Sequence, residues 1–180
     1  MSPSFSTMPG PMSLCSLAME TIIRQKIPMA AGSVPASLIE DINNLTMCEG
    51  TYNILSYSVC RYNPTTGTPL PITRLELAKD NESVTVGKTS SGFYLKWDGK
   101  WDSSLDNFVL GRSQEEGSLA WVEGSKVTKI LRQKFDQTEQ EDFLQLKFCS
   151  GGFLEIVETE KTNNDGKEDV LTRIFKYIKS

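Results

Sequence analysis

A charged side chain and two aromatic side chains alternate along one face of the last predicted strand. The residues on this face are Leu171, Arg173, Phe175 and Tyr177. A buried arginine needs an acidic partner or an anionic ligand, because an unpaired charge inside a protein is costly. With this face turned inward, Arg173 and the two rings would form a site for the charged end of an amphipathic anion. With this face at the rim, the arginine stem would cover apolar surface instead.

Other aromatic side chains form a second candidate site. Trp97 and Trp101 flank a predicted turn, and Trp121 follows in a later strand. Such rings either make a contact site for a flat ligand or a partner, or pack at the rim of a barrel. We take Tyr52, Trp97 and Trp121 as candidate ligand contacts alongside Arg173.

The chain contains no histidine, and this absence limits its chemistry. Histidine is the usual general base and the commonest metal ligand, so histidine-dependent catalytic triads are excluded. The cysteines are Cys15, Cys48, Cys60 and Cys149. They form no Cys-x-x-Cys pair, and neither a metal site nor a cofactor is expected. Reduced thiols fit a cytoplasmic protein, whereas a disulfide such as Cys48–Cys60 would fit a secreted one.

Acidic residues gather at 115–116, 139–142 and 155–160. Paired carboxylates can perform acid–base catalysis. These clusters fall in predicted turns or on predicted outer faces, so we expect them to be solvated. No constellation of Asp, Glu, Tyr, Cys or Lys indicates an enzyme, and a non-catalytic role is expected.

The bulk composition is that of an ordinary globular domain. The chain has 180 residues, of which 23% are charged, and a net charge of −4. A chain of this length buries roughly 70% of its unfolded surface, which is enough for one core. No long basic run points to nucleic acid as a partner. No stretch approaches the roughly 20 apolar residues of a transmembrane helix. We expect a cytoplasmic protein, with secretion left open.

The first 49 residues differ in pattern from the rest. Residues 1–13 are rich in proline and serine and predict a disordered tail. Residues 14–49 predict a helical segment, and apolar residues recur at helical spacing over 14–27. Residues 14–45 are therefore the segment through which a protein partner could bind.

A second helix is expected within this segment. Ser33 is a candidate N-cap, and Pro35 falls near the first turn, where its missing N–H costs nothing. The apolar stripe consists of Leu38, Ile39, Ile42 and Leu45. The helix should end near Asn44.

Residues 50–180 predict a β domain of short strands separated by turn residues. The expected strands are 50–60, 72–78, 83–88, 92–97, 107–112, 119–123, 126–135, 143–149, 153–159 and 169–178. Their alternation suits antiparallel strands with one buried face, and residues 164–166 (Asn-Asp-Gly) give the strongest hairpin signal. We predict an all-β fold: an antiparallel up-and-down β-barrel of about 8–10 strands, preceded by one or two short helices, because closure removes free edges.

Short motifs in this domain resemble those of the calycin superfamily, which comprises lipocalins and intracellular fatty-acid-binding proteins. Gly50-Thr51-Tyr52 is similar to the motif that opens their first strand. Phe108-Val109-Leu110-Gly111 is similar to the mid-barrel Phe-x-Leu-Gly of fatty-acid-binding proteins. Thr172-Arg173-Ile174-Phe175 resembles their closing Thr-Arg-x-Tyr. The resemblance spans residues 50–180 and implies a lipocalin-like barrel in which Arg173 holds a ligand carboxylate.

The chain departs from that family pattern at three places. Tyr52 replaces the usual tryptophan of lipocalins, and Phe175 replaces the tyrosine whose hydroxyl completes the carboxylate clamp. A Pro/Gly/Thr loop at 63–71 occupies the place of a helical lid. The barrel is therefore the firmer implication, and fatty-acid binding is one use of it.

Two function classes are favoured over a third, an enzyme that would rely on Asp, Glu, Tyr, Cys or Lys. The first is a non-catalytic protein whose barrel holds a small hydrophobic or amphipathic anionic ligand, with a minor variant similar to the lipocalin-like phycobiliprotein lyases. The second is a structural or interaction protein of viral or effector type, with a solid β core, that acts through protein contacts. A real internal cavity would favour the first class.

Overall fold

The structure, a computed structural model, describes residues 21, 35–72, 83–99, 103–113 and 117–180. The predicted tail at 1–13, all of the predicted helix at 14–27 except Thr21, and all but the first residue of the predicted strand 72–78 lie outside the described residues. So does Trp101, one of the two tryptophans expected to flank a turn.

Ten antiparallel strands make up one sheet in the described part of the chain. They are β1 (Gly50–Tyr62), β2 (Ser83–Thr89), β3 (Gly92–Asp98), β4 (Ser103–Val109), β5 (Gly111–Ser113), β6 (Ser118–Glu123), β7 (Lys126–Phe135), β8 (Thr138–Cys149), β9 (Phe153–Asn164) and β10 (Lys167–Lys179). The predicted all-β fold is confirmed. The last three strands are longer than their apolar patterns indicated, because their outer halves continue with polar residues.

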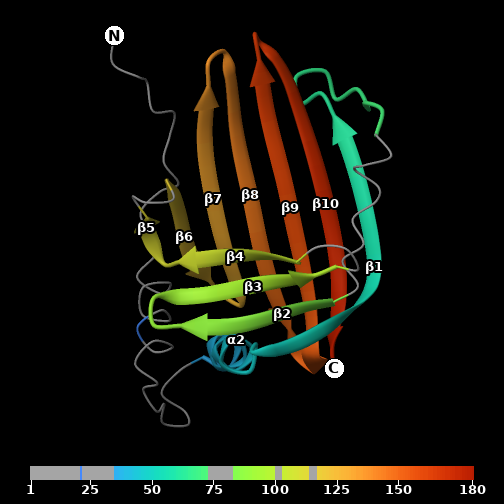
Figure 1. The fold of residues 1–180 in the computed structure, drawn as a ribbon. Coiled ribbons are helices and arrows are strands. Elements are labelled where there is room, and N and C mark those ends of the chain that lie inside the picture. Colours follow the sequence, from blue (N-terminus) through green and yellow to red (C-terminus); the bar gives the residue numbers. More distant parts are fainter. Residues whose placement is uncertain (1–20, 22–34, 73–82, 100–102, 114–116) are drawn as a thin grey trace.

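The strands follow the order β4-β3-β2-β1-β10-β9-β8-β7-β6-β5. β1 pairs with β10, so the beginning and the end of the domain meet. One bridge, between Leu110 and Ala120, joins the two ends of this order in the described residues, and the sheet forms a nearly closed barrel. In Figure 1, β2, β3 and β4 cross in front of the lower half of the long strands β7 to β10.

The near-closure depends on a break in one strand. Residues 107–112 were expected to form a single strand, but β4 ends at Val109 and β5 begins at Gly111. β4 pairs with β3, whereas β5 pairs with β6. Gly111 has a φ of 92°, which lies in the region that favours glycine, so the chain can leave one hairpin and join the next.

The hairpin signal at residues 164–166 is confirmed. β9 and β10 pair from Asn164 and Lys167 onward, which leaves Asp165 and Gly166 as the turn. Their φ values of 50° and 78° are both positive, as a type I′ turn requires.

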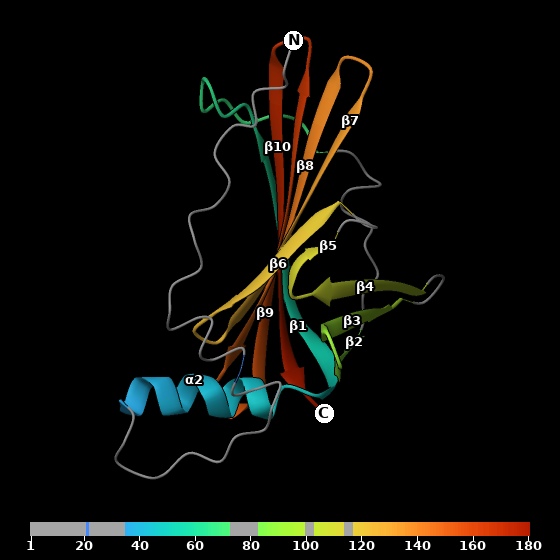
Figure 2. The ribbon, with the colours of Figure 1, turned by 90° about the vertical axis from the view of Figure 1, so that its left-hand side faces the viewer.

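Helix α2 (Ala36–Thr46) closes the lower end of the barrel (Figure 2). Its residues Ile42 and Leu45 are buried in the core, as the predicted stripe requires. The N-cap is Pro35, two residues after the expected cap at Ser33. The helix ends at Thr46, two residues after the expected end near Asn44.

Two lysines from the barrel bind the end of this helix. Lys88 Nζ donates to the Thr46 carbonyl at 2.8 Å, and Lys179 Nζ donates to the Met47 carbonyl at 2.7 Å. The last carbonyls of a helix lack helical partners, and cations there also oppose the helix dipole. The helix is therefore held at the barrel end by both packing and charge.

Side chains in the lower half of the barrel pack in apolar layers that follow the strand register. One layer consists of Phe175, Ile156, Leu146, Val127 and Val122. All five are buried. The next layer away from α2 consists of Arg173, Glu158, Leu144, Lys129 and Ala120. The interior thus changes from apolar to charged over one step of the register.

We expect Gly92→Ala to destabilise the fold by about 2 kcal/mol or more, because overpacking forces the backbone apart. A Cβ at this position would lie 1.8 Å from the Phe108 carbonyl oxygen, which is backbone and cannot turn away. Urea denaturation measures the change. Ser90→Ala, in the exposed turn between β2 and β3, is the control and should stay near wild type; equal stability of both variants would contradict the prediction.

Candidate functional site

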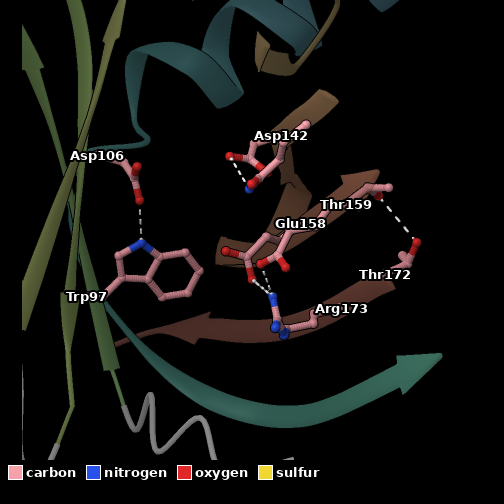
Figure 3. A network of polar contacts seen from close by, with 9 residues as sticks. Trp97, Asp106, Asp142, Glu158, Thr159, Thr172 and Arg173 are labelled. Atoms are coloured by element: carbon pink, nitrogen blue, oxygen red, sulfur yellow. Dashed lines mark hydrogen bonds and ion pairs between the residues drawn. The ribbon is translucent and has the colours of Figure 1, made fainter. Parts of the chain in front are cut away.

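Arg173 faces the barrel interior and is 6% exposed. Its Nη1 donates to Glu158 Oε2 at 3.0 Å and to Glu160 Oε1 at 2.6 Å. Figure 3 shows the contact between Arg173 and Glu158. Glu158 lies directly opposite Arg173 on β9, and Glu160 lies one inward position further along that strand. Of the two partners that a buried arginine can take, the structure provides the acidic one.

The expectation that the acidic clusters lie in turns or on outer faces is wrong for three residues. Glu158, Glu160 and Asp142 point inward and line a cavity. The alternation of side chains along β9 indicates this inward position, since Glu158 and Glu160 continue the inward series of Leu154 and Ile156. Their charge suggested an outer face, but the buried Arg173 offsets the cost of turning two of them inward.

The cavity lies in the middle of the barrel, at the boundary between its apolar and its charged layers. It has a volume of about 160 Å³ and is partly open. Its lining residues are Asp106, Lys129, Leu131, Asp142, Phe143, Leu144, Glu158 and Glu160. The cavity therefore offers four carboxylates and one ammonium group beside apolar surface.

Two of these carboxylates accept hydrogen bonds from uncharged donors. The indole Nε1 of Trp97 donates to Asp106 Oδ2 at 2.7 Å (Figure 3). The Gln140 amide donates to both oxygens of Asp142, at 2.9 and 3.2 Å. Burial raises the pKa of Asp142 above its ordinary value. The nearby charges of Glu160 and Glu158 raise this pKa further, whereas the hydrogen bond from Gln140 lowers it.

The aromatic candidates form the floor beneath the cavity. Phe175 stacks on Tyr57 with ring centroids 4.9 Å apart, and Trp97 meets it edge-on at 5.3 Å. Phe175 and Tyr177 are fully buried, and Trp97 is 5% exposed. The structure thus brings Arg173, Phe175, Tyr177 and Trp97 together, with the three rings as packing below the charged layer.

The other two candidates lie elsewhere. Tyr52 is buried near α2, where its hydroxyl donates to the Cys48 carbonyl at 2.6 Å. Trp121 alternates with the buried Ala120 and Val122, so it occupies the opposite face of β6 from the interior. Neither residue lines the cavity, and the expected ligand contact of both is not supported by their position.

A second polar hollow lies beyond the first one, near the far end of β1 and β10. The Arg61 guanidinium binds the Asp169 carboxylate through both Nε and Nη2. Asn63, Asn164 and Lys167 lie around the same hollow. The inward face beyond the Arg173 layer is thus mixed, with the buried Leu171 lying between Arg173 and this polar hollow.

The described cysteines, Cys48, Cys60 and Cys149, are free thiols. Burial raises the pKa of the Cys48 thiol to about 11, and a thiol of this kind is a packing residue rather than a nucleophile. In the described part of the chain, no three potential ligand side chains converge on a metal position. No described helix combines the length and apolar character that crossing a membrane requires.

No protein-family model matches the sequence, and no curated protein sequence matches it either. The functional argument therefore rests on the residues of the cavity.

We expect Asp142→Asn to raise the free energy of unfolding at neutral pH by about 1 kcal/mol, the scale of relieving one partly buried charge. Folding raises the pKa of Asp142, so the folded state is stabilised while this carboxyl group is protonated. That stabilisation is lost as the pH rises through the pKa of the folded state. The gain should vanish below the ordinary aspartate pKa of about 3.9.

Urea denaturation at several pH values measures this effect. Glu139→Gln is the matched control, because Glu139 pairs with Lys134 on the exposed hairpin at 2.9 Å. Its effect should stay within about 0.5 kcal/mol at every pH. A less stable Asp142→Asn variant with an unchanged pH profile would refute the assignment.

Proposed function

We propose that this protein is a non-catalytic binding protein that holds a small amphipathic molecule in its mid-barrel cavity. The observation that carries the proposal is the abrupt end of the apolar packing at the Arg173 layer, where a cavity of about 160 Å³ begins. A solid core would continue the apolar layers. Barrels of this size are able to hold one small ligand.

The chemistry of the lining supports an amphipathic occupant. Leu131 and Leu144 offer apolar surface on one side, and carboxylates offer hydrogen-bond acceptors on the other. Small-molecule sites commonly combine apolar walls with a few placed polar groups. The partial opening leaves room for part of the molecule to extend beyond the enclosed volume.

The fatty-acid ligand implied by the resemblance receives less support. Two glutamates already engage Arg173, so its charge is compensated before any ligand arrives. A ligand carboxylate would also meet the like charges of Asp106 and Asp142. The lipocalin relationship and the chromophore-handling variant remain predictions from the sequence.

Filling the cavity should abolish binding. Leu131 lines the cavity, so Leu131→Trp places a large ring inside it. Ile130→Trp is the matched control, because Ile130 alternates with Leu131 and lies on the outer face of β7. Native mass spectrometry of protein from its own source, followed by organic extraction, should show a bound small molecule in wild type and the control.

The Leu131→Trp variant should lose that molecule while it stays folded by circular dichroism. A cavity that carries no molecule in any of the three proteins would count against the binding function.

A second candidate function, protein interaction, rests on exposed apolar side chains near the C-terminal end of β10. Phe153 and Ile178 are paired across β9 and β10 and are 46% and 36% exposed. Met47 is 72% exposed, and its carbonyl binds Lys179, the neighbour of Ile178. Apolar groups that gather at one place on a surface are typical of a contact site for another protein.

Replacing Phe153 and Ile178 with serine should remove any self-association, because it deletes the apolar pair without touching the cavity. Light scattering over a concentration series measures the mass. Lys161→Ser, at an exposed position of β9, serves as the control. A wild-type mass that stays monomeric at all concentrations would remove self-association from consideration and leave only a different protein as partner.

A further inference from the structure

The charges around the cavity do not balance. Within the described residues, four carboxylates line it: Asp106, Asp142, Glu158 and Glu160. The cations there are Lys129 in the lining and Arg173 behind the two glutamates. With every group ionised, four negative charges stand against two positive ones. A partly desolvated excess of negative charge favours a cation from outside.

The excess is concentrated on one side of the cavity. Glu158 and Glu160 share the Arg173 guanidinium. Asp106 and Asp142 accept hydrogen bonds from the neutral N–H groups of Trp97 and Gln140, which bring no charge. These two aspartates, from β4 and β8, are thus the carboxylates whose charge the described chain leaves least compensated.

A second observation indicates that the polar layer lacks a partner. Arg173 is more than nine-tenths buried and points into the carboxylate layer that lines the cavity, yet its Nε has no acceptor within the described residues. A buried N–H without an acceptor is costly, and native proteins satisfy nearly all such groups. The charged layer around the cavity is therefore incompletely paired within the described residues.

We propose that the molecule bound in this cavity is an amphipathic amine, whose protonated nitrogen lies among Asp106, Asp142 and the two glutamates while its apolar part lies against Leu131 and Leu144. This inference rests on the proposed binding function and adds the charge of the ligand to it. The ammonium group supplies N–H donors and a positive charge to Asp106 and Asp142, which otherwise accept hydrogen bonds only from neutral donors among the contacts described above.

Three probes of equal chain length test the sign of the charge. Octylammonium, octanol and octanoate differ only in their head groups, and all three dissolve as monomers. Calorimetric titration of the full chain at neutral pH should give tighter binding of octylammonium than of octanol, and the weakest binding for octanoate. A difference of about tenfold corresponds to about 1.4 kcal/mol.

Paired variants show whether the carboxylates cause this order. Asp106→Asn combined with Asp142→Asn should weaken octylammonium binding about tenfold and leave octanol binding unchanged. Glu123→Gln combined with Glu139→Gln removes the same charge from exposed positions outside the cavity, and should change neither. Equal weakening in both pairs would mean that bulk charge rather than the cavity attracts the amine, and would overturn the proposal.

The outcomes separate the ligand class from the binding function. Octanoate as the tightest probe would overturn the amine while leaving a binding protein. A native molecule that is extracted from the protein but carries no basic nitrogen would do the same. If no probe binds and no molecule is extracted, the binding function itself fails.

Discussion

The shared guanidinium of Arg173 is the interaction on which the middle of this barrel depends. Two glutamates from β9 face inward only because one buried cation lies between them. Their presence ends the apolar layers below, since no aliphatic side chain can satisfy a carboxylate. The cavity, the hydrogen bond from Trp97 to Asp106 and the raised pKa of Asp142 all belong to the charged layer that follows. Removing the cation would leave two partly buried glutamates without the guanidinium that they share.

Below that layer, the barrel is filled and anchored from one side. Helix α2 inserts Ile42 and Leu45 into the core, and lysines from β2 and β10 bind its last carbonyls. Phe175 and its aromatic neighbours complete a floor that is buried on all sides. The two halves therefore differ in character: the lower half holds the apolar core, whereas the upper half contributes the polar lining of the cavity. The apolar core and the polar cavity are consequently formed by different residues of the same strands.

Alternation along single strands predicted much of this architecture, because each strand has one buried face. It correctly identified Arg173, Phe175 and Tyr177 as one face, and the same rule would have turned Glu158 and Glu160 inward had their charge not been taken as a sign of solvation. The partner of Arg173 depends on the register between β9 and β10, which only the pairing of strands reveals. The break at Leu110 was not predictable from the pattern, since residues on both sides favour strands. Trp121 lies on the opposite face of β6 from the buried Ala120 and Val122, so the alternation alone already placed it away from the interior.

The break between β4 and β5 has a consequence for how a molecule reaches the interior. Within the described residues, a single bridge joins Leu110, between β4 and β5, to Ala120 on β6, whereas neighbouring strands in the sheet order share ladders of backbone hydrogen bonds. Asp106 on β4 and Lys129 on β7 line the cavity from opposite sides of that junction. Separation there disrupts the fewest backbone bonds, so the barrel has a lateral seam as well as an open end. Under the proposed binding function, exchange of a molecule would follow the rate at which the seam parts, so its residence time would change without any change in its contacts inside the cavity.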